Sequence, residues 1–483
     1  MGDLLNNFRS GHRARAIARL GGLLAVGGSL LLSGCGGSNS TASSVAAAPP
    51  PPPVQTANWP TYGLNNARTR YLPTDVVKPP YKIGWKFDPG KLMEYSPIVV
   101  GDRIYGIDNN GLAFAINSRN GKRVWQADVA SANASAPTYS DGKLFISNLT
   151  PGQVLALNAA NGKVVWRHPL PGRTESSPLV VGNTVVAGCE CNTVFALDAQ
   201  SGKQLWSTGV GGAVKGSPAE SGGVVYVGDY SGEMTALHLS TGKTVWQTGT
   251  DGSVYAAATV AFGHVYAGTT SGSMYSFDQQ TGNVAWSHST SGYVYSAAAA
   301  AKTADTPPTV YFGSYDGTVY ALNAANGSER WTQPASGPVS GAGSVIGDVY
   351  YVGDLKTTRT YGFRVTDGKN VLEFQDGAYN PAISDGRHLF LTGYRIIYQL
   401  HPVQGRSVNG FAAKASAAAK AKRDPKKKGK HKRKANKGKG KKGGHKKKGH
   451  GHHKKHKRHH RKHKRHKHHK GHGHHKHQGR KRG

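Results

Sequence analysis

Short apolar runs alternate with glycine-containing turns along most of the chain. The runs are four to six residues long, rich in Val, Tyr and Trp, and bounded by Asp-Gly, Ser-Gly, Asn-Gly or Thr-Gly. Such dipeptides supply the positive φ angles of hairpin turns, and β-branched and aromatic residues favour strands. The pattern is clearest over residues 225–246 and recurs over residues 310–331. It predicts four short antiparallel strands in each repeat.

The repeat has a period of about forty residues, which its tryptophans mark. Trp59 stands alone, and the other seven follow at steps of 40, 41, 40, 40, 40 and 45 residues: Trp85, Trp125, Trp166, Trp206, Trp246, Trp286 and Trp331. A degenerate seventh repeat ends at residues 368–372, where Leu372 replaces tryptophan. A four-stranded unit repeated in this way predicts the blades of a β-propeller.

The two ends of the repeat region are expected to share an eighth blade. Residues 381–400 give three strands without an outer strand, whereas residues 83–87 have the tryptophan pattern with no blade before them. We therefore expect an all-β protein, an eight-bladed propeller of four-stranded antiparallel blades over residues 58–402. The longer step before Trp331 indicates a surface loop insertion around residues 304–308.

The amino end has the features of a bacterial export signal. Four arginines precede a twelve-residue apolar stretch, residues 21–32, which is too short to span a bilayer. The stretch closes on Leu32-Ser33-Gly34-Cys35, which resembles the bacterial lipobox, whose cysteine is acylated and becomes the new amino terminus. We expect a lipoprotein signal peptide over residues 1–34, lipidation of Cys35, and a Ser/Ala/Pro-rich tether over residues 35–57. The protein would then be exported and anchored to the cell envelope, at the outer face of the cytoplasmic membrane or at the outer membrane, depending on the host.

Most of the net charge of +36 lies at the carboxyl end. Residues 411–483 hold 32 of the 62 Lys and Arg, 16 of the 23 histidines and a single acid, Asp424. With almost nothing apolar to bury, residues 403–483 are expected to be a disordered basic tail. The alternatives for the tail are attachment to anionic envelope polymers or lipids, metal capture by its histidines, or no specific role. The near-neutral remainder, and a tail without aromatic residues after Phe411, argue against sequence-specific nucleic-acid binding.

A recurring motif, Ala-Leu-(Asn/Asp)-x-x-x-Gly-Lys-x-x-Trp, gives the chain a family resemblance. Residues 156–166 are an example, and the motif resembles the pyrroloquinoline-quinone (PQQ)-type propeller repeat, including the BamB-like lipoproteins. The lead-in, residues 59–63 with 69–71, looks like the first strand of that superfamily. In WD40 repeats Asp follows the tryptophan, and here no repeat has Asp at that position. The resemblance implies either a scaffold for outer-membrane β-barrel assembly or a quinoprotein dehydrogenase.

The regular spacing favours the scaffold. A quinoprotein dehydrogenase of this superfamily uses PQQ, a calcium ion, a catalytic carboxylate and adjacent cysteines, and it carries long insertions between blades. Steps of 40 and 41 residues leave almost no room for such insertions. We therefore expect no catalytic residue and no cofactor, and a monomer whose propeller binds envelope proteins. The alternative is a small dehydrogenase that uses PQQ and calcium.

The repeat also predicts which residues surround the axis. Nine residues after each tryptophan, where the chain reaches the innermost strand, stand Glu94, Ala134, Glu175, Lys215, Tyr255, Tyr295 and Ser340. The candidate ligand patch comprises Glu94, Arg173, Glu175, Lys215, Tyr255 and Tyr295. Glu94 and Glu175 could coordinate a cation and Lys215 could meet an anion, or these side chains are simply solvated.

Two cysteines lie close together in a predicted hairpin turn. For Cys189 and Cys191 we leave three interpretations open: free thiols, a local disulfide, or a redox or metal role.

Overall fold

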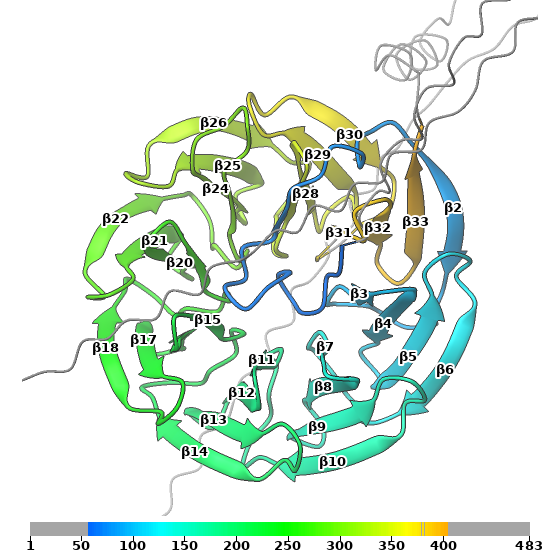
Figure 1. Cartoon of the computed structure of the whole chain (residues 1–483). Helices are drawn as coiled ribbons and strands as arrows, with labels where there is room; N and C mark the ends of the chain where they lie inside the picture. The colour runs from blue at the N-terminus through cyan, green and yellow to red at the C-terminus, as the bar shows by residue number, and fades with distance from the viewer. Residues whose placement is uncertain (1–56, 378, 381, 404–483) are drawn as a thin grey trace, which may run out of the picture. The chain divides into compact units, whose positions relative to one another are not determined.

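The structure is a computed structural model that describes residues 57–377, 379–380 and 382–403. These residues form eight sheets arranged in a ring around one axis (Figure 1). This confirms the predicted eight-bladed, all-β propeller. The signal peptide, Cys35, nearly all of the predicted tether and the basic tail lie outside the described residues. Among the described residues, no helix is both long and apolar enough to cross a membrane.

Each blade consists of antiparallel strands that follow one another from the axis outward. Blades one to four are β3 (Ile98–Val100), β4 (Arg103–Ile107), β5 (Leu112–Asn117), β6 (Arg123–Asp128); β7 (Thr138–Ser140), β8 (Lys143–Asn148), β9 (Gln153–Asn158), β10 (Val164–Pro169); β11 (Leu179–Val181), β12 (Thr184–Cys189), β13 (Thr193–Asp198), β14 (Gln204–Gly209); and β15 (Ala219–Ser221), β16 (Val224–Gly228), β17 (Glu233–His238), β18 (Thr244–Gly249). Blades five to seven are β19 (Thr259–Ala261), β20 (His264–Gly268), β21 (Ser273–Asp278), β22 (Val284–Ser289); β23 (Ala299–Ala301), β24 (Thr309–Gly313), β25 (Thr318–Asn323), β26 (Glu329–Pro334); and β27 (Ser344–Ile346), β28 (Val349–Gly353), β29 (Thr360–Arg364), β30 (Asn370–Phe374). The innermost strand is the shortest, at three residues, so the blades can converge on the axis.

The eighth blade joins the two ends of the described chain. Its inner strands are β31 (Ala382–Ser384), β32 (Leu389–Thr392) and β33 (Ile397–Pro402), and β2 (Tyr81–Phe87) pairs antiparallel with β33 as its outer strand. Figure 1 shows β2, in blue, beside β33, in orange. This confirms that the strand containing Trp85 completes the last blade.

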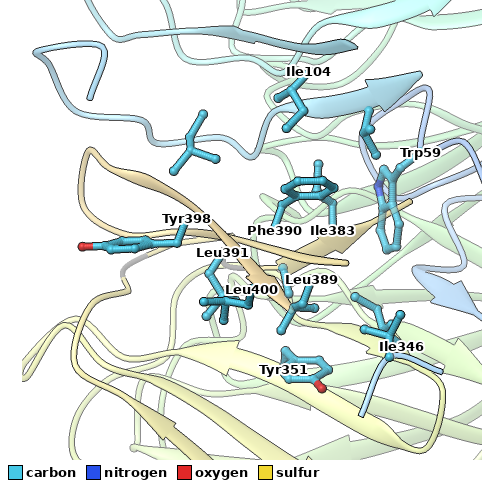
Figure 2. Packing of buried hydrophobic residues seen from close by; sticks show 14 of the residues in the cluster. Trp59, Ile104, Ile346, Tyr351, Ile383, Leu389, Phe390, Leu391, Tyr398 and Leu400 are labelled. Atoms are coloured by element: carbon cyan, nitrogen blue, oxygen red, sulfur yellow. The ribbon is translucent and has the colours of Figure 1, made fainter. Parts of the chain in front are cut away.

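A buried cluster packs the closing blade against its neighbours (Figure 2). Phe390 and Leu400 of blade eight lie with Ile104 of blade one, Tyr351 of blade seven and Trp59, all of them at most 2% exposed. Because these residues come from the beginning and the end of the propeller, this part of the core is complete only when the ring is closed.

The seven repeated tryptophans each connect one blade to the next, and blade seven has Leu372 at this position instead. In every case the indole Nε1 donates a hydrogen bond of 2.8 to 3.1 Å to a backbone carbonyl in the following blade; the acceptors are Ser118, Ala159, Ala199, Leu239, Gln279, Ala324 and Val365. The glycine of the motif packs against the same ring. A Cβ on Gly242, for example, would lie 2.6 Å from Cε3 of Trp206. The glycine of one repeat therefore meets the tryptophan of the preceding repeat at seven of the eight blade interfaces, which explains why the motif contains both.

The lead-in, residues 57–72, does not form the first strand of a blade, although its resemblance to the superfamily implies that it does. Trp59 makes only an isolated bridge with Val99, and β1 (Tyr71–Leu72) adds in parallel to β27 at the inner edge of blade seven. In between, the segment passes along the inside of the ring (Figure 1). Its carbonyls accept hydrogen bonds from the middle residue of the innermost strand in blades one, two, four, five, six and seven: Val99, Tyr139, Glu220, Val260, Ala300 and Val345. Residues 57–72 therefore line the axis and connect the blades from within.

Candidate functional site

Two sets of loops meet on one face of the ring, which we call the axial face. They are the loops that lead from each outermost strand to the next innermost strand, and the turns between the second and third strands of a blade. At the centre of this face is a small pocket, the axial pocket, with a volume of about 50 Å³. Its lining is Tyr62, Glu94, Tyr95, Tyr255, Tyr295, Ser340, Gly341, Ala342, Tyr379 and Asn380.

The lead-in contributes both to the pocket and to the packing around the axis. Arg68, next to Tyr62 in space, is fully buried and donates from Nε to the Pro218 carbonyl at 2.6 Å and from Nη2 to the Ser177 carbonyl at 3.2 Å. Burial, together with the positive charge of Arg70, lowers the pKa of Arg68 to about 9. The guanidinium therefore links blades three and four to the lead-in, and it positions the segment that carries Tyr62.

Beside the pocket, four charged side chains form a continuous chain. Glu175 accepts from Lys215 Nζ at 2.9 Å and from the Tyr255 hydroxyl at 3.0 Å. Lys215 also lies 3.7 Å from Glu190, and Glu190 accepts from Arg173 at 3.0 Å. Burial alone would lower the pKa of Lys215, but the hydrogen bond and charge of Glu175, aided by the charge of Glu190, outweigh it and raise that pKa. The lysine therefore stays charged and is already paired.

The structure brings most of the predicted ligand patch together. Glu94, Tyr255 and Tyr295 line the axial pocket, and Glu175 and Lys215 lie beside it in the ionic chain. The sixth patch residue, Arg173, lies at the outer end of that chain, where its side chain is 59% exposed and contacts Glu190. The sequence prediction missed Glu190, Tyr95 and Tyr379 as members of the site.

Glu94 differs from the other carboxylates near the axis. Its Oε2 accepts a hydrogen bond of 3.0 Å from Asn109 Nδ2, and no cation within the described ranges forms an ion pair with it. Burial raises the pKa of Glu94, and the charge of Glu175 adds to this effect, while the hydrogen bond from Asn109 and the charge of Lys215 oppose it. Glu94 is therefore a partly buried carboxylate without an ion-pair partner among the described residues.

Tyrosines extend from the pocket across the axial face as a group that we call the tyrosine arc: Tyr230, Tyr255, Tyr293, Tyr295 and Tyr315. The ring centroids of Tyr255 and Tyr315 each lie 5.1 Å from that of Tyr295. Tyr230 and Tyr293 are 39% and 51% exposed. An exposed group of aromatic rings on one face is typical of a surface that contacts another molecule.

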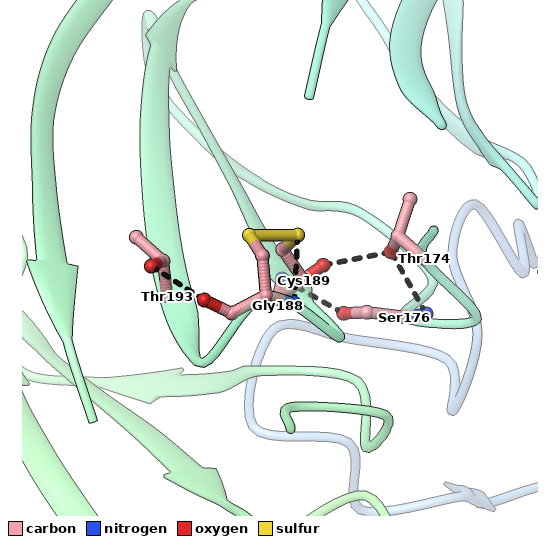
Figure 3. Close-up of a disulfide and its surroundings, with 6 residues drawn as sticks. Thr174, Ser176, Gly188, Cys189 and Thr193 are labelled. Carbon is pink, nitrogen blue, oxygen red and sulfur yellow. Dashed lines mark hydrogen bonds between the residues drawn. A yellow bond between two sulfur atoms is a disulfide. The ribbon is translucent and has the colours of Figure 1, made fainter. Parts of the chain in front are cut away.

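A disulfide joins Cys189 and Cys191 in the turn of blade three (Figure 3). The turn is also held by hydrogen bonds to Gly188: its carbonyl accepts from Thr174 Oγ1 at 2.7 Å, and its amide donates to Ser176 Oγ at 3.1 Å. Of the three interpretations of the cysteine pair, the structure contains the local disulfide. Glu190 lies between the two cysteines, so the same closed turn carries the carboxylate that joins the ionic chain.

The pocket does not fit the quinone and metal of the dehydrogenase alternative. PQQ is a flat molecule with several carboxylates, and a pocket of about 50 Å³ is far below the several hundred Å³ that cofactor-sized ligands need. The charged group in the lining is the carboxylate Glu94, which would repel the carboxylates of PQQ. The nearby cation, Lys215, is already paired with Glu175. Over the described part of the chain, no three His, Cys, Asp or Glu side chains are placed to hold a metal ion. We therefore derive no reaction step through PQQ or calcium.

The Gly–Trp repeat motif, and the closing of the ring by β2 and β33, identify the chain as a PQQ-like β-propeller repeat protein. Residues 109–215 and 190–409 match the family of outer membrane protein assembly factor BamB, which is well over half of the chain. The protein belongs to this family. No protein of curated function matches the sequence.

Solved structures of two kinds have the same fold. BamB from Moraxella catarrhalis is 19% identical with a TM-score of 0.57, and the match covers 68% of this chain and 100% of that one. Quinohemoprotein alcohol dehydrogenase from Comamonas testosteroni is 15% identical with a TM-score of 0.60, covering 72% of this chain and 81% of that one. A europium-containing methanol dehydrogenase is 15% identical with a TM-score of 0.56, covering 69% and 89%. At these identities the likeness shows the fold, which an assembly factor and dehydrogenases share.

Proposed function

We propose that this protein is a non-catalytic scaffold of the bacterial cell envelope that binds partner proteins through its axial face. The observation that carries the proposal is the tyrosine arc, which presents exposed rings on a closed and well-packed ring of blades. Tyrosine is enriched at the centres of protein interfaces because it buries a large area with little loss of conformational freedom. Membership of a family described as an outer membrane protein assembly factor supports the same role.

Photocrosslinking tests this face directly. A benzoylphenylalanine at Tyr293 or at Tyr230 should capture the same envelope protein in intact cells, identified by mass spectrometry. Phe262 is the matched control. It is 42% exposed in the turn between β19 and β20, which lies on the opposite face, and its replacement by benzoylphenylalanine also exchanges one aromatic ring for another. A partner captured from both tyrosines and not from Phe262 supports the scaffold. Capture from Phe262 alone, or from none of the three, contradicts it.

The proposal includes export and a lipid anchor at Cys35. The arginines, the apolar stretch and the lipobox-like end of the first 35 residues support it, as does the family description. Two or more acyl chains hold a protein on a membrane stably, whereas one chain is marginal. Cys35→Ser should therefore move the protein from the detergent phase to the aqueous phase on phase separation. A variant that stays in the detergent phase would show that another element anchors the chain.

The proposal assigns the basic tail to anionic lipids or polymers of the envelope. Its excess of Lys and Arg supports electrostatic attachment, whose strength should fall steeply with salt because bound counterions are released. In the Cys35→Ser protein, which lacks the lipid anchor, deleting residues 412–483 should abolish binding to phosphatidylglycerol vesicles and leave the melting temperature of the propeller unchanged. Equal binding by the full and shortened chains, or binding that is indifferent to salt, rules this role out.

A further inference from the structure

We propose that the axial pocket binds the cationic head group of a lysine or arginine side chain from a partner protein. The inference rests on the proposed function, because it names the chemistry that the partner presents to the same face. One carboxylate and five tyrosines from five segments of the chain line the pocket: Glu94, Tyr62, Tyr95, Tyr255, Tyr295 and Tyr379. Such a lining combines a negative charge with aromatic rings, the two features that attract an organic cation.

Glu94 gives the pocket a carboxylate that has no direct ion-pair partner among the described residues, although the charge of Lys215 acts on it from a distance. Its neighbour Glu175 has Lys215 at 2.9 Å, and Glu190 has both Lys215 and Arg173 within 4 Å. Glu94 accepts a hydrogen bond from the amide of Asn109 and, in the described part of the chain, has no cation within ion-pair distance. A cation in the pocket would supply the missing partner and favour the ionised carboxylate, whereas an anion would be repelled.

Tyrosine rings around the axis already receive cations from the chain itself. The ammonium of Lys215 lies 5.4 Å from the ring centroid of Tyr230, and the guanidinium carbon of Arg70 lies 4.6 Å from that of Tyr62. The attraction comes from the negative face of the ring and increases where water is excluded. Tyr62 belongs to the axial pocket, and the other four tyrosines of the pocket offer further rings around its open space.

The size of the pocket selects one head group. One water molecule needs roughly 10–15 Å³ of such space, so about 50 Å³ accommodates an ammonium or guanidinium group but not a whole nucleotide or sugar. The rest of the ligand must lie outside, across the exposed tyrosine arc. A long side chain of a docked protein has this shape, with a narrow stem and a charged end.

Saturation-transfer NMR on the full-length protein tests the pocket with n-butylammonium, which has the shape of a lysine side chain. We expect saturable binding, and none for n-butanol, which has a similar size and no charge. Glu94→Gln should weaken the binding roughly tenfold, since a charge-assisted contact is lost. Tyr295→Leu should weaken it as well, whereas Tyr295→Phe, which keeps the ring, should not. Tyr394→Leu, at an exposed tyrosine that does not line the pocket, is the matched control.

The pH dependence gives a second readout from the same experiment. Binding should tighten as the pH rises through the pKa of Glu94 and then stay level until the ammonium group loses its proton near pH 10. If n-butanol binds as well as n-butylammonium, or if Glu94→Gln and Tyr295→Leu bind like the wild type, the cation pocket is wrong.

Crosslinking separates this inference from the scaffold on which it rests. Glu94→Gln should reduce capture of the partner from position 293, and Glu233→Gln, at another carboxylate of the axial face, should not. If capture is unchanged by Glu94→Gln, the scaffold stands and the inserted basic side chain is overturned. If n-butylammonium binds but no partner is captured, the pocket stands and the proposed function fails.

Discussion

A glycine in the following blade makes room for each repeated tryptophan. Gly242 has a φ of +69°, which side chains rarely tolerate, and it packs against the indole of Trp206. The same turn provides the Leu239 carbonyl that accepts from the Trp206 Nε1 at 2.8 Å. A side chain at position 242 would therefore be strained in its backbone and would also displace the ring that joins the two blades.

We expect Gly242→Ala to lower the free energy of unfolding by roughly 1–3 kcal/mol, the usual cost of a residue with a side chain held at positive φ. Gly209→Ala is the control, because Gly209 does not have a positive φ and a Cβ there would meet no atom within 4 Å. Thermal unfolding followed by circular dichroism checks both variants. Equal melting temperatures would show that the glycine is not needed for the contact.

At the scale of strands and loops, the sequence predicted the blades because each blade repeats the same local pattern. The position of β2 in blade eight followed from residues 83–87 having no companion strands nearby in sequence. The course of the lead-in could not be predicted in this way. It has no period, and Leu64, Arg68 and Arg70 adopt positive φ values that follow from contacts with several blades rather than from local preference.

The candidate site was predictable only where the repeat itself defines it. Counting nine residues from each tryptophan placed Glu175, Lys215 and Tyr255 on three successive blades. In the structure, Glu175 accepts hydrogen bonds from both of the other side chains. Glu190 comes from a turn between second and third strands, a position that this spacing does not sample. Tyr379 was missed because its repeat has Leu372 in place of tryptophan and a shorter loop before the innermost strand.

The closing strand pair contains a histidine that makes this blade sensitive to pH. His401 of β33 pairs with Lys82 of β2, and its ring centroid lies 4.7 Å from that of His388. Burial lowers the pKa of His401, and the charges of His388 and Lys82 lower it further, while Asp385 opposes them. A base with a lowered pKa in the folded state binds a proton more readily when unfolded. Protonation of this site therefore favours unfolding.

We expect the melting temperature to fall between pH 7.5 and 5.5, as the pH crosses the unfolded histidine pKa of about 6.5, and to fall less in His401→Gln. His238→Gln, at an exposed histidine of β17, should keep the wild-type dependence. Asp385 does not contribute to the change between pH 7.5 and 5.5. Its pKa is lowered in the folded state, so its contribution to the free energy of unfolding is lost only at more acidic pH. Identical pH profiles for His401→Gln and the wild type would assign the effect to other groups.

Across the whole molecule, two independent features close the ring. The first is β2, which gives blade eight its outer strand. The second is the lead-in, which contacts all eight blades: besides its bonds to six innermost strands, it reaches blade three through Arg68 and blade eight through the bond from the Ala57 amide to the Asp385 carbonyl. Side-chain contacts near the axis, such as the hydrogen bond from Tyr255 to Glu175, also join blades that are not neighbours, but the lead-in is the one segment shown to contact all eight blades in the described part of the chain.

Two shortened chains separate these features. A variant that begins at Pro73 keeps β2 and loses the lead-in, so we expect a lower melting temperature with a single cooperative transition. A variant that begins at Gly90 loses β2 as well and leaves β33 as an unpaired edge with its apolar face exposed, so its blades should unfold in stages. Circular dichroism and tryptophan fluorescence should give coincident transitions for the first variant and different midpoints for the second. A chain beginning at Asn58 is the reference, and if the Gly90 variant unfolded in one transition at the same temperature as this reference, neither feature would be needed to close the ring.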